Sequence, residues 1–152
     1  DDPNSVSDVV FQVGLNDTRQ GMSTKKIREQ TLELQLKYWR HFKKARQHLT
    51  ALPPIGDDQI QLNHELQKLS SHTESNFVST KAFRDWATGK MRKNLMTNEY
   101  HYNDIGIKTL ARKIKTSLFL ESNKSGTSLD RLITFESATP TEADVSVINV
   151  EN

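Results

Sequence analysis

Lysine and arginine side chains gather in two stretches of this sequence and are its strongest chemical signal. One stretch surrounds Trp39 and Phe42, and the other covers residues 90–93 and 108–115. A one-sided basic surface is typical of proteins that neutralise nucleic-acid phosphates and release their counterions. The same side chains could instead be the solvated faces of amphipathic helices. The candidate nucleic-acid-binding residues are Arg40, Lys43, Lys44, Arg92, Lys93, Arg112 and Lys113.

The charge is distributed unevenly along the 152 residues. The formal net charge is only +2, yet residues 22–115 carry +9, while residues 1–21 carry −3 and residues 116–152 carry −4. Because the acidic residues are separated from the basic ones, this pattern favours a basic binding domain with acidic ends.

Catalytic and metal-binding patterns are few. The sequence has no cysteine, which excludes disulfides, thiolate nucleophiles and cysteine-ligated metals. His41 and His48 would lie about 10 Å apart along a helix, too far to share a metal ion. No glycine-rich phosphate loop or dinucleotide-binding turn occurs. We therefore expect no cofactor, no small-molecule substrate and no enzymatic activity.

A polar stretch at residues 98–104 holds enough oxygen and nitrogen ligands to bind a cation. Its spacing matches no cation-binding loop. Asn103 or Asp104 can cap a following helix instead. We therefore interpret the stretch as a solvated turn between two helices.

The spacing of apolar residues predicts four helices. Residues 23–51 contain neither proline nor glycine, and their apolar side chains recur with the period of one long amphipathic helix. The same period predicts further helices within residues 57–79, 80–95 and 107–118.

The expected fold is all-α, an antiparallel bundle of about four helices with disordered acidic tails. Its parts would be an acidic linker over residues 1–21, the helical bundle over residues 22–120 and a flexible tail over residues 121–152. Trp39 and Trp86 lie beside the apolar stripes of their helices, so we expect both in the core.

Three further observations concern the start of the chain, membrane contact and the C-terminal residues. The chain begins at Asp1 rather than at methionine, which indicates a processed or excised piece. No apolar run is long enough for a membrane helix, so we expect no membrane contact. The alternating apolar residues at 145–150 could form an edge strand or a partner-recognition segment instead of a disordered tail.

Several short motifs precede the last predicted helix in a defined order. The segments Phe83-Arg84-Asp85-Trp86, Arg92-Lys93-Asn94-Leu95 and Glu99-Tyr100 precede a basic helix at residues 107–115. This order resembles the helical C-terminal domain of the chromodomain-helicase-DNA-binding chromatin remodelers. The first helix, with its basic segment at residues 40–45, is similar to the opening helix of that family, and the likeness covers residues 34–117.

The resemblance implies a four-helix domain without catalysis of its own that binds duplex DNA or nucleosomes largely independently of base sequence. It also implies a nuclear location and other chromatin proteins as further partners. The basic residues by themselves leave two alternatives, a protein–protein interaction bundle and a secreted helical ligand.

Overall fold

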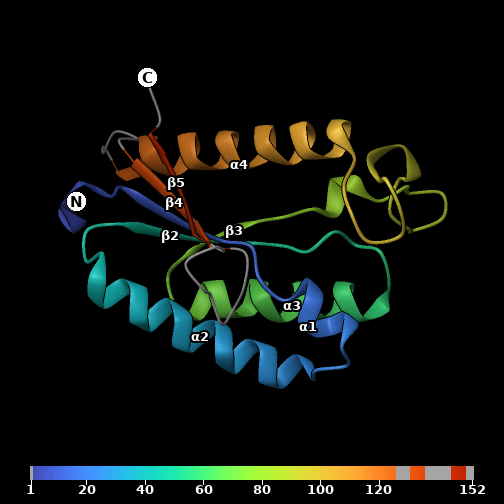
Figure 1. Ribbon diagram of the computed structural model, residues 1–152, viewed down its shortest axis with the longest axis horizontal. Coiled ribbons are helices and arrows are strands. Elements are labelled where there is room, and N and C mark those ends of the chain that lie inside the picture. The colour runs from blue at the N-terminus through green and yellow to red at the C-terminus, as the bar shows by residue number, and fades with distance from the viewer. Residues whose placement is uncertain (1, 126–130, 136–144, 150–152) are drawn as a thin grey trace.

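A five-stranded sheet between two layers of helices forms the fold (Figure 1). The computed structural model describes residues 2–125, 131–135 and 145–149. The first four strands in spatial order run parallel, and the last pairs antiparallel with its neighbour. The strands, in the order in which they lie across the sheet, are β3 (Asn76–Val78), β2 (Arg46–Thr50), β1 (Asp8–Phe11), β4 (Arg131–Phe135) and β5 (Val145–Asn149).

Helices cover both faces of this sheet. Helix α4 (Asp104–Ser125) lies on one face, and α2 (Thr24–His41) and α3 (Asp57–His72) lie on the other, with the short α1 (Leu15–Arg19) beside α3 (Figure 1). Single turns of 3-10 helix occur at Pro3–Ser5, Lys81–Phe83 and Lys93–Leu95. No helix in the described part of the chain is both long and apolar enough to cross a membrane.

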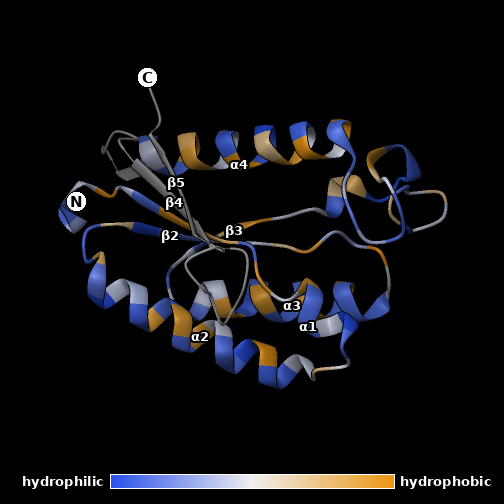
Figure 2. Cartoon of the chain, in the orientation of Figure 1, coloured by the Kyte–Doolittle hydropathy of each residue, from blue (hydrophilic) through white to orange (hydrophobic). Residues whose placement is uncertain are grey.

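Strand β1 is the centre of the core. All four of its residues are buried, because helices pack on both faces of the strand. Val9 and Phe11 belong to the apolar cluster that includes Leu34 of α2, whereas Val10 packs with Ile114 of α4. The apolar colouring of Figure 2 accordingly follows the strands and the helix faces that point toward them.

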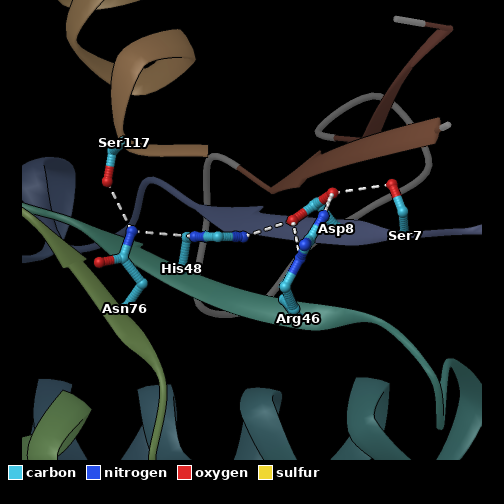
Figure 3. Close-up of polar contacts among 6 residues, drawn as sticks. All are labelled: Ser7, Asp8, Arg46, His48, Asn76 and Ser117. Atoms are coloured by element: carbon cyan, nitrogen blue, oxygen red, sulfur yellow. Dashed lines mark hydrogen bonds and ion pairs between the residues drawn. The ribbon is translucent and has the colours of Figure 1, made fainter. Parts of the chain in front are cut away.

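A buried polar network crosses three strands on the α4 side of the sheet (Figure 3). The carboxylate of Asp8 is 0% exposed and accepts hydrogen bonds from Arg46 Nε and Nη2 at 2.9 Å each. It also accepts from His48 Nε2 at 2.7 Å and from the hydroxyl of Ser7 at 2.7 Å. Burial by itself raises the pKa of Asp8, but these hydrogen bonds outweigh it and hold the pKa below its ordinary value of 3.8.

Asn76, at the far end of this network, determines which ring nitrogen of His48 carries the hydrogen. The amide nitrogen of Asn76 lies 3.0 Å from His48 Nδ1 and 2.6 Å from the hydroxyl oxygen of Ser117 on α4. Because an amide nitrogen can only donate, His48 Nδ1 accepts and Nε2 carries the hydrogen that Asp8 receives. The network therefore joins β1, β2, β3 and α4 through fully paired groups.

The expectation of an all-α antiparallel bundle is wrong, because the chain folds as an α/β sheet protein. The helix expected over residues 23–51 begins as predicted, with Ser23 accepting a hydrogen bond from the amide of Lys26. It ends at His41, however, and a turn at Lys43 and Lys44 leads into β2. Ala45, Leu49 and Leu52 lie in or beside β2 and continue the helical spacing, so the predicted period extends past the end of the helix by coincidence.

Of the other three predicted helices, two are present and one is absent. Helix α3 lies within its predicted range, and α4 begins after a cap at Asn103 as expected. No helix forms over residues 80–95, which hold two single 3-10 turns and a bridge between Arg84 and Met91. Trp86, expected in the core, is 96% exposed.

Both ends of the chain contribute to the sheet. Strand β1 and helix α1 come from residues 1–21, which the sequence assigned to a linker. The expected tail over residues 121–152 supplies β4 and β5, and β5 is the edge strand that the alternating residues allowed. Residues 126–130, 136–144 and 150–152 lie outside the described part of the chain.

The Asp8→Ala variant should lose about 3–5 kcal/mol of unfolding free energy at pH 7, because Arg46 and His48 would keep their burial without the carboxylate. Since the pKa of Asp8 is lowered in the folded state, its contribution is complete above pH 4 and is lost as pH falls through the folded pKa. Urea unfolding at pH 7 and below pH 4 measures both effects. The matched control is Glu29→Ala in the exposed pair with Lys25, expected to cost at most ~1 kcal/mol. An equal cost of Asp8→Ala and Glu29→Ala at pH 7 would contradict the role of the network.

Trp86→Ala should change the unfolding free energy by less than about 0.5 kcal/mol, since the side chain is almost fully exposed. Phe83→Ala, three positions earlier and 3% exposed, should cost about 3–5 kcal/mol. Chemical denaturation of both variants checks this contrast, and a large loss for Trp86→Ala would place that residue in a packed contact.

Candidate active site

A pocket of about 470 Å3 opens where β1 and β2 end. Gln12 and Val13 follow β1, and Thr50 ends β2 with residues 51–53 beyond it. In open parallel sheets the ligand site lies at the carboxyl ends of the strands, beside the strand where the order reverses. Here that strand is β1, since β2 and β3 lie on one side of it and β4 on the other. The pocket therefore occupies the position where this type of sheet binds ligands, and its volume suits a small molecule.

A glycine turn delivers Asn16 to this pocket. Gly14 has φ of +106°, and a Cβ atom there would lie 2.8 Å from a methyl carbon of Leu62 and 3.3 Å from one of Ile27. Only glycine meets both conditions, because its lack of a Cβ avoids the strain and the clash. Asn16 follows two residues later, is exposed in the pocket and forms no side-chain hydrogen bond within the described part of the chain. Its amide is thus free to donate to a ligand.

His101 enters the pocket from the loop before α4. The Oδ1 atom of Asn98 accepts hydrogen bonds from the backbone N–H groups of Tyr100 at 2.8 Å and His101 at 2.9 Å. These two donors identify that atom as the amide oxygen, and it lies 3.1 Å from His101 Nδ1. An amide oxygen can only accept, so Nδ1 carries the hydrogen and Nε2 keeps a free lone pair. The exposed imidazole of His101 is therefore oriented as a proton acceptor.

Contacts at both ends of the loop restrain this histidine. The guanidinium of Arg19 at the end of α1 lies 3.6 Å from the ring centre of Tyr100, a cation–π contact. Asn103 accepts a hydrogen bond from the amide of Gly106 at 2.8 Å, which caps α4, and it donates to the carbonyl of Asn94 at 2.8 Å. The loop is therefore tied to α1 and to α4, the two helices that border the pocket.

Two buried hydroxyl groups in the pocket lining lack partners. Thr50 is 2% exposed, and its Oγ1 forms no hydrogen bond in the described part of the chain. The hydroxyl of Tyr102 is also buried without a partner, and burial raises the pKa of this side chain. Buried polar groups are nearly always paired, so an unpaired one at a pocket calls for an explanation. Both oxygens lie below the pocket surface, so a ligand in the pocket does not contact them directly.

Two polar groups in this pocket are therefore available to a ligand. His101 offers a free lone pair, and Asn16 offers a free amide donor. Within the described residues, no group of three or more histidine, aspartate or glutamate side chains could hold a metal ion. A lone pair and an amide hydrogen-bond donor are groups that a general base and an oxyanion donor require.

The residues predicted to bind nucleic acid do not form one face. Arg40, Lys43 and Lys44 lie at the end of α2, on the layer opposite α4. Arg92, Arg112 and Lys113 line a separate groove beside α4, and Lys93 lines neither the groove nor the pocket of His101. The structure therefore divides the seven predicted residues between these two places, with Lys93 apart from both.

Sequence reasoning did not single out Asn16, and it weighed His101 only as part of the polar stretch at residues 98–104. A local signal exists for each, since Gly14-Leu15-Asn16 follows an apolar run and His101 lies just before the helix cap Asn103. Nothing local connects the two, because only the sheet brings the end of β1 beside the start of α4.

The sequence matches no protein-family model and no curated protein. The fold is similar to a solved structure from Streptococcus pneumoniae that is provisionally assigned as a platelet activating factor, with a TM-score of 0.66 and 17% sequence identity. The match covers 73% of this chain and 59% of the other, so the chain spans about three fifths of the length of that protein. The likeness shows a shared fold.

The resemblance to chromodomain-helicase-DNA-binding remodelers is wrong. That domain would be a helical bundle, whereas this chain has a parallel sheet and matches the fold of a bacterial protein. The expectation of a nuclear protein in chromatin remodelling is corrected with it. It rested on that resemblance, and the matching structure comes from a bacterium, which has no nucleus.

Gly14→Ala should destabilise the protein more than Gly21→Ala does. Both glycines have positive φ, so each variant should lose roughly 1–2 kcal/mol to backbone strain. At Gly21 a Cβ meets nothing within 4 Å, whereas at Gly14 it meets Leu62 and Ile27 and should cost a further ~1–3 kcal/mol. Urea unfolding of the two variants measures the difference, and equal losses would show that the turn is not packed as described.

Proposed function

We propose that the protein hydrolyses a carboxylic ester bound at the carboxyl ends of β1 and β2, with His101 as the general base. One observation carries the proposal. The hydrogen bond from Nδ1 to Asn98 leaves Nε2 of an exposed histidine free, in a pocket that also holds the free amide of Asn16. A base whose tautomer is fixed by an orienting group is the arrangement that general-base catalysis requires.

The attacking oxygen in this reaction is that of a water molecule, because no serine or cysteine lines the described part of the pocket. His101 Nε2 takes one proton from the water while the water oxygen forms a bond to the ester carbonyl carbon. The carbonyl electron pair moves onto the carbonyl oxygen, and the amide of Asn16 donates a hydrogen bond to the resulting oxyanion. His101 then gives its proton to the alkoxide as the ester C–O bond breaks, and the products are an acid and an alcohol.

Apolar side chains in the pocket lining suit one part of the substrate. Val13, Leu52 and Leu110 form an apolar lining that suits a hydrocarbon part of the ester.

The side chain of Asn98, which orients His101, also affects the expected rate of ester hydrolysis. Asn98 is neutral, so it holds the ring of His101 but does not offer the negative charge that stabilises an imidazolium. We therefore expect a slower hydrolase than one that pairs its histidine with a carboxylate. Asn98→Asp, which introduces a carboxylate at this position, should raise kcat.

The test uses hydrolysis of p-nitrophenyl acetate and p-nitrophenyl butyrate by the purified chain. His101→Gln should lower kcat/KM by about 10²–10⁴-fold, since glutamine cannot act as a base. Asn16→Ala should lower it by about 10²–10³-fold through loss of the oxyanion donor. Absorbance at the nitrophenolate band measures the rates.

The matched control is His72→Gln on α3, an exposed histidine outside the pocket. Free imidazole itself hydrolyses such esters slowly, so this variant separates catalysis in the pocket from surface histidine chemistry. The control should retain the parent rate. The proposal is rejected when His101→Gln and His72→Gln have equal rates, or when the parent does not exceed an equal concentration of imidazole.

A further inference from the structure

Residues 84–91 form a short hairpin in the segment between β3 and α4, which we call the Trp86 hairpin. A bridge between Arg84 and Met91 closes it, and below the bridge the N–H of Arg92 donates to the carbonyl of Phe83 at 2.9 Å. Phe83 and Met91 are buried in one apolar cluster. The hairpin is therefore anchored on the core at its base, in the segment whose loops extend past the start of α4 at the right of Figure 1.

Trp86 lies in the tip of this hairpin and is 96% exposed. Its ring forms no stacking or cation–π contact within the described part of the chain. A tryptophan ring exposed to water in this way gains none of the free energy that burial of its apolar surface provides. The ring is therefore available to a partner that removes it from water.

The backbone of the tip is already paired within the hairpin. The N–H of Asp85 donates to the carbonyl of Lys90, and the N–H of Gly89 donates to the carbonyl of Asp85. The N–H of Ala87 donates to Oδ1 of Asp85 at 2.9 Å, and the carbonyl of Gly89 accepts from Arg84 Nε at 2.8 Å. Because paired polar groups cost less free energy to remove from water than unpaired ones, this tip can enter a less polar surrounding.

The hairpin and its base carry a strong positive charge. Residues 81–93 contain five lysine or arginine residues and one acid, Asp85, which gives a net charge of +4. None of the five forms an ion pair with a residue that the structure describes, and all are exposed except the half-buried Arg84. The other four are Lys81, Lys90, Arg92 and Lys93. This uncompensated charge attracts an anionic surface to the same hairpin that exposes Trp86.

One exposed ring among positive charges distinguishes between classes of partner. The centre of a protein interface contains several large apolar side chains, whereas the other exposed residues of the hairpin are small, polar or charged. Single-stranded nucleic acid is held in a basic groove, and Trp86 does not line the groove beside α4. Tryptophan is enriched at the membrane–water interface, and neighbouring lysine and arginine residues bind anionic lipids there. The hairpin therefore matches a lipid bilayer best.

We propose that the Trp86 hairpin binds the surface of an anionic lipid bilayer. The ring of Trp86 enters the headgroup region, and the four exposed cations contact lipid phosphates. An apolar and an electrostatic contribution together give the two signals that stable surface binding requires. The expectation of no membrane contact rested on the absence of a spanning helix, which binding by a loop does not need. The proposal is independent of ester hydrolysis, since none of residues 81–93 lines the pocket of His101.

The end of α2 provides a matched control. Trp39 is the second tryptophan of the chain, and Arg40, Lys43 and Lys44 follow it. It differs from Trp86 in being only 55% exposed. A general attraction of a basic protein to anionic vesicles would depend equally on both places, whereas docking by the hairpin depends on one.

The experiment measures co-sedimentation of the purified chain with phosphatidylcholine vesicles that contain about 30% phosphatidylglycerol. Trp86→Ala should lower the partition coefficient by at least ~10-fold. The variant Lys81→Gln/Lys90→Gln/Arg92→Gln/Lys93→Gln should lower it by about 10²-fold or more, since each charge near the membrane contributes roughly fivefold. Trp39→Ala and Arg40→Gln/Lys43→Gln/Lys44→Gln should stay within about threefold of the parent, with circular dichroism confirming that all four variants are folded.

Tryptophan fluorescence locates the contact. In Trp39→Phe the one remaining tryptophan is Trp86, and its emission should shift to shorter wavelength when the anionic vesicles are added. In Trp86→Phe the emission of Trp39 should stay unchanged. A loss of binding caused by misfolding would not produce this contrast between the two tryptophans.

Four other results overturn the proposal. The first is the absence of binding to anionic vesicles at low salt, and the second is equal binding to vesicles of phosphatidylcholine alone. The third is an equal loss in the Trp86→Ala and Trp39→Ala variants, which would indicate a general attraction. The fourth is binding of oligothymidylate that requires Trp86, without binding of vesicles, which would assign the hairpin to nucleic acid.

Discussion

The buried carboxylate of Asp8 is the constraint on which the rest of the structure depends. A charge at 0% exposure is tolerated only when it is fully paired, and here Arg46 and His48 of the neighbouring strand supply the pairing. These bonds form only when β2 lies parallel to β1 with Arg46 opposite Asp8. The same register brings His48 opposite Asn76 of β3. The network therefore favours one alignment of three strands, and their carboxyl ends meet at one edge.

The structure holds two histidines with defined tautomers, and exposure decides what each can do. His48 is completely buried, with one nitrogen donating to Asp8 and the other accepting from Asn76, so neither is available to a ligand. His101 is exposed, and among the described residues only its Nδ1 has a hydrogen-bond partner. A histidine that donates to a carboxylate, as His48 does to Asp8, resembles a catalytic pair, but this one is buried. In this fold it is the histidine next to an asparagine that faces a pocket.

Different sides of helix α4 contact the sheet, the pocket of His101 and the groove beside β3. Ile114 and Leu118 pack on the sheet, and Ile107 and Leu110 border the pocket of His101. Arg112 and Thr116 line the groove between α4 and β3. The start of the helix is fixed by the Asn103 cap and by Gly106, where a Cβ would collide with the carbonyl oxygen of Leu95. A shift of this helix would therefore alter the core, the pocket and the groove together.

What the sequence by itself determined was local. Ser23 starts α2 and Asn103 caps α4, because a side chain that reaches an amide three residues ahead needs no distant partner. The end of α2 was decided by tertiary structure, since residues 46–50 leave the helical path to pair with β1 and β3, and no proline or glycine marks that point. The same holds for the candidate site. Asn16 and His101 lie far apart in the chain, and they share a pocket only because parallel strands bring their carboxyl ends to one edge, a consequence of long-range pairing that no local pattern encodes.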